Sequence, residues 1–407
     1  MEKSFDEVIS RRGTNCAKYD EMDKKYGEDV LHCGVADMDF QVPESIRDAC
    51  KKVVEHGIFG YTNLPSCYPG VVGEWIRREY GCEVEDEWIL FSPRINIGLN
   101  MAVETFTKPG DKVIVHMPAY PALTEAVEKH NRIILESPLK WDGVRWNMNF
   151  SELEAQMDDS VKMMILCNPQ NPTGRVWGAE ELKVVERFCI EYDLLLLSDE
   201  IHADIVREGK KFNSVLSLSE QMKKRMVVYQ SITKTFNIPG IIFSNMIVPD
   251  LEMRQAMKAA VDCEGFHNPN VFAAAVIEPA YRECGAWKRA LNTYLDGNFR
   301  YLAGYLKEKM PLFELRAPEG TFLAWISYEK TGLTEEEICS FFLKDAKVSV
   351  YEGSHFGEQG RGYIRFNAAV PRGVLKEILD RIERAYCERW SALWQEGALI
   401  KHLKLLQ

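Results

Sequence analysis

Through most of its length the chain alternates short apolar runs with amphipathic stretches. The runs at 161–167 and 226–230 are apolar almost throughout, whereas 179–192 has apolar residues at helical spacing, at Leu182, Val185 and Phe188. Apolar strands that alternate with helices are typical of a mostly parallel sheet covered on both faces. We therefore expect an α/β fold, with strands at 88–91, 112–116, 132–136, 161–167, 194–197, 226–230 and 241–248.

The same pattern predicts helices and a division into domains. In the first part of the chain, helices are expected at 45–56, 68–80, 94–106, 122–130 and 179–192. After residue 286, a smaller α+β domain is expected, with helices at 287–310, 334–343 and 374–394 and strands at 312–316, 348–351 and 363–367. The tail to Gln407 is apolar enough to dock as a helix. The expected divisions are an N-terminal arm at 1–45 that packs with the small domain, a large domain at 46–285 and a small domain at 286–407.

Charge and cysteine content narrow the class of protein. A formal charge of −11 at pH 7 argues against binding to nucleic acid or to an anionic membrane surface. The 11 cysteines include no CxxC pair, which argues against a disulfide framework or a metal site and predicts reduced thiols in the cytoplasm. The charged segment MEKSFDEVISRR has no apolar region of the kind found in signal peptides, so no signal peptide is expected. No apolar run approaches the roughly 20 residues that span a bilayer.

Polar residues whose side chains can react or form hydrogen bonds follow the predicted strands. Tyr120, Asn171, Asp199 and Lys234 each lie just beyond the end of one. Because ligands of parallel sheets bind outside the carboxyl ends of the strands, we expect these four residues to meet at one site. The alternatives are a packed Tyr120, an Asn-Pro turn at Asn171 and a helix cap at Asp199.

Lys234 has the sharpest chemical interpretation of the four. It lies close to the hydroxyl residues Ser231 and Thr233 in the segment 229–244, YQSITKTFNIPGIIFS. Two short hydrogen-bond donors beside an amine suit an anionic phosphate, and the amine is then free for covalent chemistry. The alternative is an exposed surface charge, which is the usual state of a lysine.

Several ordered motifs resemble those of known pyridoxal 5′-phosphate (PLP) enzymes. The aspartate aminotransferase fold type, fold type I, is indicated by NPQNPTG at 168–174, Asp199-Glu200, Ser231-x-Thr233-Lys234 and Arg365-x-Asn367. Other motifs resemble the cystathionine β-lyase branch, the MalY/PatB-like C–S lyases: VADMDF at 35–40, His56-Gly57-x-x-Gly60-Tyr61, Lys234-Thr-Phe-Asn237 and Gly320-Thr-Phe-Leu-x-Trp325. The resemblance spans roughly residues 30–385 and implies a seven-stranded large domain with a smaller domain beside it.

The resemblance implies a role for each residue at the strand ends. Lys234 is expected to hold PLP as a Schiff base and later to take the Cα proton of the substrate. Asp199 would pair with the pyridine nitrogen, so that the ring accepts the electrons of the carbanion. Asn171 would donate to the phenolic oxygen of PLP and contact the substrate, Tyr120 would stack on the ring, and His202 would support the cofactor.

The phosphate and substrate sites follow from the same resemblance. Ser231, Thr233 and the amides of Ile95 and Asn96 would bind the phosphate. Tyr61 would reach the phosphate and substrate of the neighbouring subunit, which implies a homodimer with shared active sites. Arg365 would form a bidentate pair with the substrate carboxylate, which suits its planar fork; the alternative is a surface salt bridge.

Some residues depart from the family pattern. Arg94-Ile95-Asn96 stands where Gly-Val-Val is usual, and Ser-Ile-Thr stands before Lys234 where the lyases commonly have Ala-Pro-Ser. No arginine follows Lys234 before Arg254, so the additional phosphate-binding arginine of many aminotransferases is missing.

The resemblance leaves three functions to compare. A C–S β-lyase would convert cystathionine or a related L-cysteine S-conjugate into a thiol, pyruvate and ammonia. An aminotransferase acting on an L-amino acid and a 2-keto acid would use the same residues up to the carbanion. A regulatory role, in which the fold contacts a transcription factor, could coexist with catalysis.

Overall fold

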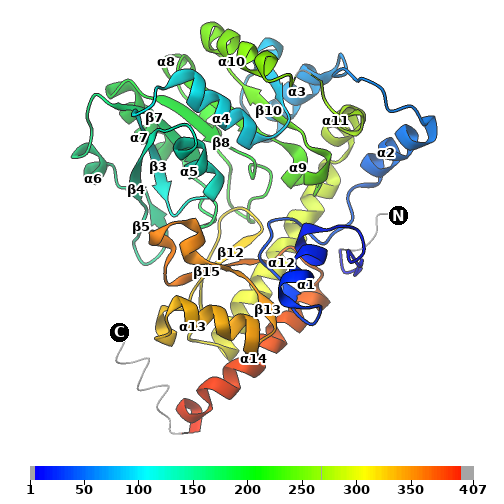
Figure 1. Cartoon of the computed structure of the whole chain (residues 1–407), viewed down its shortest axis with the longest axis vertical. Helices are drawn as coiled ribbons and strands as arrows, with labels where there is room; N and C mark the ends of the chain where they lie inside the picture. Colours follow the sequence, from blue (N-terminus) through cyan, green and yellow to red (C-terminus); the bar gives the residue numbers. More distant parts are fainter. Residues whose placement is uncertain (1–4, 267, 396–407) are drawn as a thin grey trace.

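The structure, a computed structural model, describes residues 5–266 and 268–395. A central sheet is formed by β2 (Ile89–Ser92), β3 (Lys112–Met117), β4 (Ile133–Pro138), β7 (Val161–Cys167), β8 (Leu195–Asp199), β9 (Met226–Gln230) and β10 (Ser244–Ile247). The strand order is β2-β10-β9-β8-β7-β3-β4 (Figure 1). Only β10 is antiparallel to its neighbours, β2 and β9. The predicted fold, with a mostly parallel seven-stranded sheet, is confirmed.

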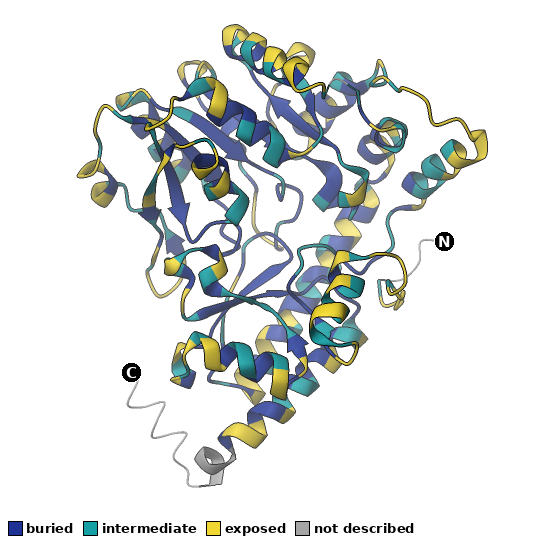
Figure 2. Ribbon diagram, in the orientation of Figure 1, coloured by how far each residue is buried: buried dark blue, intermediate teal, exposed yellow. Residues whose placement is uncertain are grey.

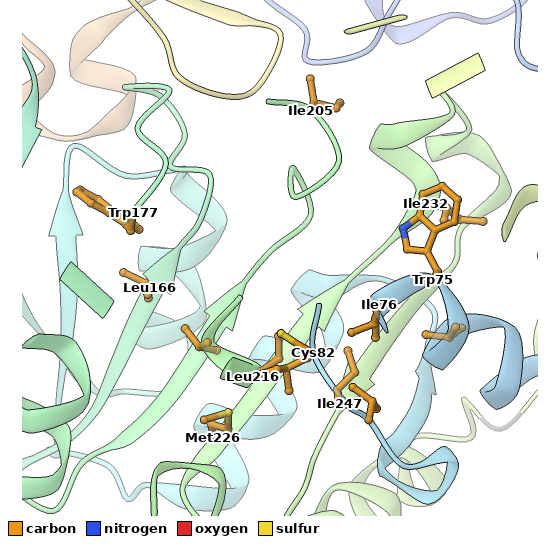
Figure 3. Packing of buried hydrophobic residues seen from close by; sticks show 14 of the residues in the cluster. Trp75, Ile76, Cys82, Leu166, Trp177, Ile205, Leu216, Met226, Ile232 and Ile247 are labelled. Carbon is orange, nitrogen blue, oxygen red and sulfur yellow. The ribbon is translucent and has the colours of Figure 1, made fainter. Parts of the chain in front are cut away.

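Alternate residues of each strand pack on opposite faces of this sheet, as the period of two in a strand requires. Val115 and Ile165 pack with the helices of one face, α4 (Ile95–Phe106), α5 (Pro121–Glu128) and α10 (Leu251–Cys263). Ile114 and Met164 pack on the other face with α3 (Tyr68–Tyr80), α7 (Ala179–Glu191) and α11 (Val271–Glu283). Figure 3 shows part of this second core, where Trp75, Ile76, Ile232 and Ile247 lie together. The sheet is therefore covered on both sides.

The small domain has an antiparallel sheet in the order β11-β12-β15-β14, with strands at Glu314–Arg316, Leu323–Ser327, Tyr363–Asn367 and Tyr351–Glu352 respectively. Its core also includes α13 (Glu335–Ser340) and α14 (Arg372–Gln395). The long helix α12 (Gly285–Lys309) joins the two domains (Figure 1). Residues in its first half pack in the core of the large domain and residues in its second half pack in the core of the small domain.

The N-terminal segment contains a π-helical turn (Ala17–Glu21), α1 (Met22–Tyr26) and the short strand β1 (Leu31–His32). β1 pairs in parallel with β13 (Val348–Ser349). The next helix, α2 (Glu44–His56), packs on α11 at the edge of the molecule, and much of it is exposed (Figure 2). The limits expected for the arm and the two domains, 1–45, 46–285 and 286–407, stay a prediction.

Several predicted elements differ in detail from the structure. The strand expected at 241–248 begins only at Ser244, because Pro239–Ile241 form a 3-10 turn. The strand expected at 348–351 is divided into β13 and β14, which belong to different sheets. The helix expected at 334–343 ends at Ser340 and continues as a π-helical turn. The helix expected for the tail to Gln407 falls on residues after 395, which lie outside the described residues.

Other elements had no counterpart in the prediction. The sequence pattern did not predict α10 or α11, and α11 contains Pro279, a residue that usually breaks a helix. Other short elements include the hairpin β5–β6 (Lys140–Trp141 and Trp146–Asn147) and the helices α6 (Phe150–Glu154), α8 (Glu220–Lys223) and α9 (Ile232–Thr235). Within the described ranges, no helix is both long and apolar enough to cross a membrane.

Candidate functional site

A cavity of about 160 Å³ lies at the carboxyl ends of β3, β7, β8 and β9. Apart from Tyr61 and Arg365, the site residues expected from the sequence all line it: Ile95, Asn96, Tyr120, Asn171, Asp199, His202, Ser231, Thr233 and Lys234. A wider groove of about 1060 Å³, between α2 and α11, contains none of them. The strand ends therefore bring the expected residues together in one place.

Lys234 is positioned by a turn of helix that directly follows β9. Ser231 caps this helix: its Oγ accepts a hydrogen bond from the amide of Thr233 at 3.1 Å and donates to the carbonyl of Phe243 at 2.5 Å. The Nζ of Lys234 donates a hydrogen bond to the carbonyl of Ala36. Burial lowers the pKa of Lys234 to about 8, and the charge of Asp37 acts in the opposite direction.

Asp199 is the last residue of β8 and is buried. Burial raises the pKa of its carboxyl group to about 6, while a hydrogen bond from the amide of Ile201, at 3.1 Å, and the charge of Lys234 lower it. A buried carboxylate of this kind gains stability from a cation in the cavity. Asp199 is therefore suited to pair with a protonated ring nitrogen.

The first turn of α4 supplies free amides to the cavity. The amides of Ile97 and Gly98 donate to the carbonyl of Arg94, whereas those of Ile95 and Asn96 donate to no acceptor among the described residues. Free amides at a helix N-terminus favour an anion. Arg94 also lines the cavity and is exposed, so this end of the cavity has a cation at the position where the resembling family usually has Gly-Val-Val.

Arg365 comes from β15 of the small domain and is buried. Its Nη1 donates to the Oδ1 of Asn171 at 3.1 Å, and its Nη2 donates to the carbonyl of Gly34 at 3.0 Å. Its Nε has no hydrogen-bond partner in the described part of the chain. Burial lowers the pKa of Arg365 to about 10. The guanidinium is thus connected to the cavity through Asn171, with one buried donor left over.

His202 and Tyr61 have contrasting environments. His202 lines the cavity, is buried, and its Nδ1 lacks a hydrogen-bond partner among residues 5–266 and 268–395. Burial holds the pKa of His202 well below its usual value, and the charges of Lys234 and Arg365 lower it further. Tyr61 does not line the cavity of its own chain, and its side chain is fully exposed.

The sequence did not assign roles to three residues at this site. Ala36, within the VADMDF motif, accepts the hydrogen bond from Lys234. Asn237 binds the same segment through the backbone of Met38 and Phe40. Ile242 lines the cavity with a φ of 56°, which is unusual for a β-branched residue. The motifs that contain Ala36 and Asn237 were the available signal for these two residues, whereas no sequence motif pointed to Ile242.

The described residues contain no group of three or more His, Cys, Asp or Glu side chains that could hold a metal ion. The candidate site is therefore organised around an amine, a carboxylate and free amides. This donor set suits a phosphorylated aromatic aldehyde.

Comparison with known proteins gives consistent matches. Residues 28–382 match the model of the family described as aminotransferase class I and II. Cystathionine beta-lyase PatB of Bacillus subtilis (strain 168) is 36% identical over 384 residues, which cover 94% of this chain and 99% of PatB.

Solved structures match equally well. A PLP-bound protein from Clostridium difficile 630, provisionally called an aminotransferase, has a TM-score of 0.91 and 34% identity and covers 94% of this chain and 99% of its own. Cystalysin from Treponema denticola, which contains PLP, has a TM-score of 0.91 and 30% identity and covers 95% of this chain and 100% of its own.

Proposed function

Because the chain belongs to the class I and II aminotransferase family, we propose that it is a PLP-dependent C–S β-lyase. Its substrates are cystathionine or related L-cysteine S-conjugates, and its products are a thiol, pyruvate and ammonia. The observation that carries the proposal is the cavity where the amine of Lys234 lies with Asp199 and the free amides of α4. Similarity to a cystathionine β-lyase along 94% of the chain favours β-elimination over transamination.

The residues that line the cavity fit PLP. The amides of Ile95 and Asn96, with the hydroxyl of Thr233, form the phosphate site. Asp199 would pair with the ring nitrogen, and Tyr120 would pack against the ring. When bound, PLP supplies an electron-accepting ring that stabilises negative charge on the Cα of the substrate.

Lys234 would hold PLP through its amine, and the same amine would accept the Cα proton of the substrate. A pKa of about 8 suits this role, since a fraction of the amine is neutral near neutral pH. Removal of this proton would allow the bond between Cβ and the β-sulfur to break, and the sulfur would leave as a thiolate.

Arg365 binds the α-carboxylate of the substrate, and Asn171 binds the phenolic oxygen of the cofactor. Because the Oδ1 of Asn171 accepts from Arg365, its amide nitrogen is the part that donates to the phenolic oxygen. The carboxylate of the substrate pairs with the buried guanidinium, which has an unpartnered Nε among the described residues. His202 supports the cofactor from the end of β8.

Tyr61 supports the proposal of a homodimer with shared active sites. Its side chain is exposed, as are those of the neighbouring Ile58 and Phe59, which are 69% and 60% exposed. Adjacent exposed apolar side chains mark interaction surfaces. The partner's Tyr61 then completes the phosphate and substrate site. A cytoplasmic location is supported by the 11 cysteines, none of which forms a disulfide within the described residues.

The decisive experiment is an assay with cystathionine and no keto acid. We expect pyruvate and a free thiol to accumulate over many turnovers, because β-elimination needs no second substrate. The Lys234→Ala variant serves as the inactive control. An aminotransferase would stop after a single turnover and resume only when a keto acid is added, and this result would contradict the proposal.

A further inference from the structure

Residues 34–40 cross between the two domains beside Lys234. The carbonyl of Ala36 accepts a hydrogen bond from the Nζ of Lys234. On the large-domain side, the side chain of Asn237 binds the backbone of Met38 and Phe40. On the small-domain side, the side-chain Nδ2 of Asn367 donates to the carbonyls of Val35 and Asp37 at 2.7 Å and 2.6 Å. The backbone of this segment is therefore held from both sides.

The two carboxylates of the segment are held by residues nearer the start of the N-terminal arm. Arg11 forms a bidentate pair with Asp37, at 2.9 Å and 2.5 Å, and its Nη1 also donates to Asp39 at 2.8 Å. The Nζ of Lys18 donates to Asp39 at 2.8 Å, and the hydroxyl of Tyr19 donates to it at 2.7 Å.

The part of this ion-pair cluster around Asp39 is buried. Lys18 is fully buried, and the side chain of Asp39 is only 7% exposed. Removing one member of such a cluster leaves its partner charge unpaired, which is costly. The arm therefore fixes the conformation of residues 34–40 more firmly than exposed ion pairs would.

The cluster also controls the charge near Lys234. Burial is the largest influence on the pKa of Lys234 and lowers it, whereas the carboxylate of Asp37 raises it. Asp199 raises this pKa as well, Arg365 lowers it, and His202 faces the same amine. Arg11 compensates the charge of Asp37, so Lys234 faces an ion pair in place of a bare carboxylate.

We propose that Arg11 and Lys18 of the N-terminal arm are positioning residues for Lys234. They hold residues 34–40 so that the carbonyl of Ala36 faces Nζ, and Arg11 compensates the charge of Asp37 beside it. The inference rests on the proposed role of Lys234 in holding PLP. The inference gives the arm a part in the reaction. Among the described residues of the arm, none before Ala36 lines the cavity.

The test is a pH titration of the visible absorbance of the holoenzyme, which reports the proton on the Lys234 nitrogen. In Arg11→Met the uncompensated carboxylate of Asp37 favours the protonated form, so the midpoint moves to higher pH. We expect a shift of about half a pH unit, less than for fully buried pairs because Arg11 is 26% exposed. Asp37→Asn moves the midpoint to lower pH, and Arg11→Met/Asp37→Asn moves it back toward the wild-type value.

Arg12→Met is the matched control. Arg12 is the next residue of the arm, but it pairs with Asp23 at 2.6 Å and with the carbonyl of Glu28. Its loss should leave the midpoint unchanged. Arg11→Lys keeps the charge without the bidentate geometry, so its midpoint should lie closer to the wild-type value than that of Arg11→Met.

An Arg11→Met enzyme with a lower melting temperature and an unchanged midpoint would overturn the inference, because the arm would then have only a structural role. This outcome is distinguishable from failure of the proposed function. The titration needs PLP on Lys234 but no substrate, so it gives the same answer whether the enzyme is a lyase or an aminotransferase. Visible absorbance that persists in Lys234→Ala would instead remove the role of Lys234 itself.

Discussion

At the scale of single residues, burial is the main cause of the unusual acid–base properties of the site. Burial lowers the pKa of Lys234 to about 8 and raises that of Asp199 to about 6. Both shifts arise because the low-dielectric interior disfavours the charged form, which is the cation for lysine and the anion for aspartate. A bound cation opposite Asp199 and a neutral amine at Lys234 would each relieve this cost.

The Lys234→Ala variant tests the role assigned to this single residue. We expect β-elimination to fall by at least about 10²-fold, the lower range for loss of a general base. The visible absorbance of the lysine-bound cofactor should disappear. Lys258→Ala, which removes an exposed lysine of α10, is the matched control and should change neither signal. A cofactor adduct that borohydride still reduces onto another lysine would show that Lys234 was assigned wrongly.

At the scale of elements, the position of α4 depends on its close approach to the sheet. A Cβ at Gly98 would lie 2.8 Å from a ring carbon of Tyr229 and 2.9 Å from the sulfur of Met246. The hydroxyl of Tyr229 donates to the carbonyl of Gly98 at 3.0 Å. Because the first turn of the same helix supplies the free amides of the cavity, this contact also positions the proposed phosphate site.

Gly98→Ala should therefore disturb both stability and cofactor binding. We expect the free energy of unfolding to fall by about 1–3 kcal/mol through overpacking, and PLP to bind more weakly because the first turn of α4 moves. Chemical unfolding and cofactor titration would measure the two effects. The control is Gly304→Ala on α12, where a Cβ meets nothing within 4 Å.

The two substitutions should change the free energy of unfolding in opposite directions. The control should gain about 0.5–1 kcal/mol in the free energy of unfolding, because alanine is favoured over glycine in a helix. A similar gain in Gly98→Ala would mean that the sheet tolerates the added methyl group and that α4 is not held at this point.

At the scale of the whole molecule, the cavity joins parts that are distant along the chain. The large domain contributes Lys234 and Asp199, the small domain contributes Arg365 through Asn171, and the N-terminal arm contributes Ala36. The shared-site proposal adds Tyr61 from the partner subunit. Catalysis should thus depend on the arrangement of whole domains and subunits.

Mixing two inactive variants tests this arrangement. Tyr61→Ala and Lys234→Ala homodimers should each be impaired, since every site in them lacks one residue. After subunit exchange, a hybrid dimer has one site with both Lys234 and the partner's Tyr61 intact, so activity should return. Light scattering should give a dimer for each variant. Exchange that occurs without recovery of activity would contradict the shared site.

The amino-acid sequence alone determined the fold class and the neighbourhood of the site. Apolar runs that alternate with amphipathic stretches predicted the parallel sheet, and strands such as Val161–Cys167 and Met226–Gln230 have the predicted limits. Once the strands are parallel, the residues after them must gather at one edge of the sheet. This is why Tyr120, Asn171 and Asp199 could be placed together before the structure was known.

Only the tertiary structure decided how these groups are held and charged. The contact of Lys234 with Ala36 joins residues 198 positions apart, and that of Arg365 with Asn171 joins residues 194 positions apart. A pattern of neighbouring residues contains no information about such pairs. The pKa shifts of Lys234 and Asp199 also could not be predicted from the sequence, because burial depends on every element packed around a side chain.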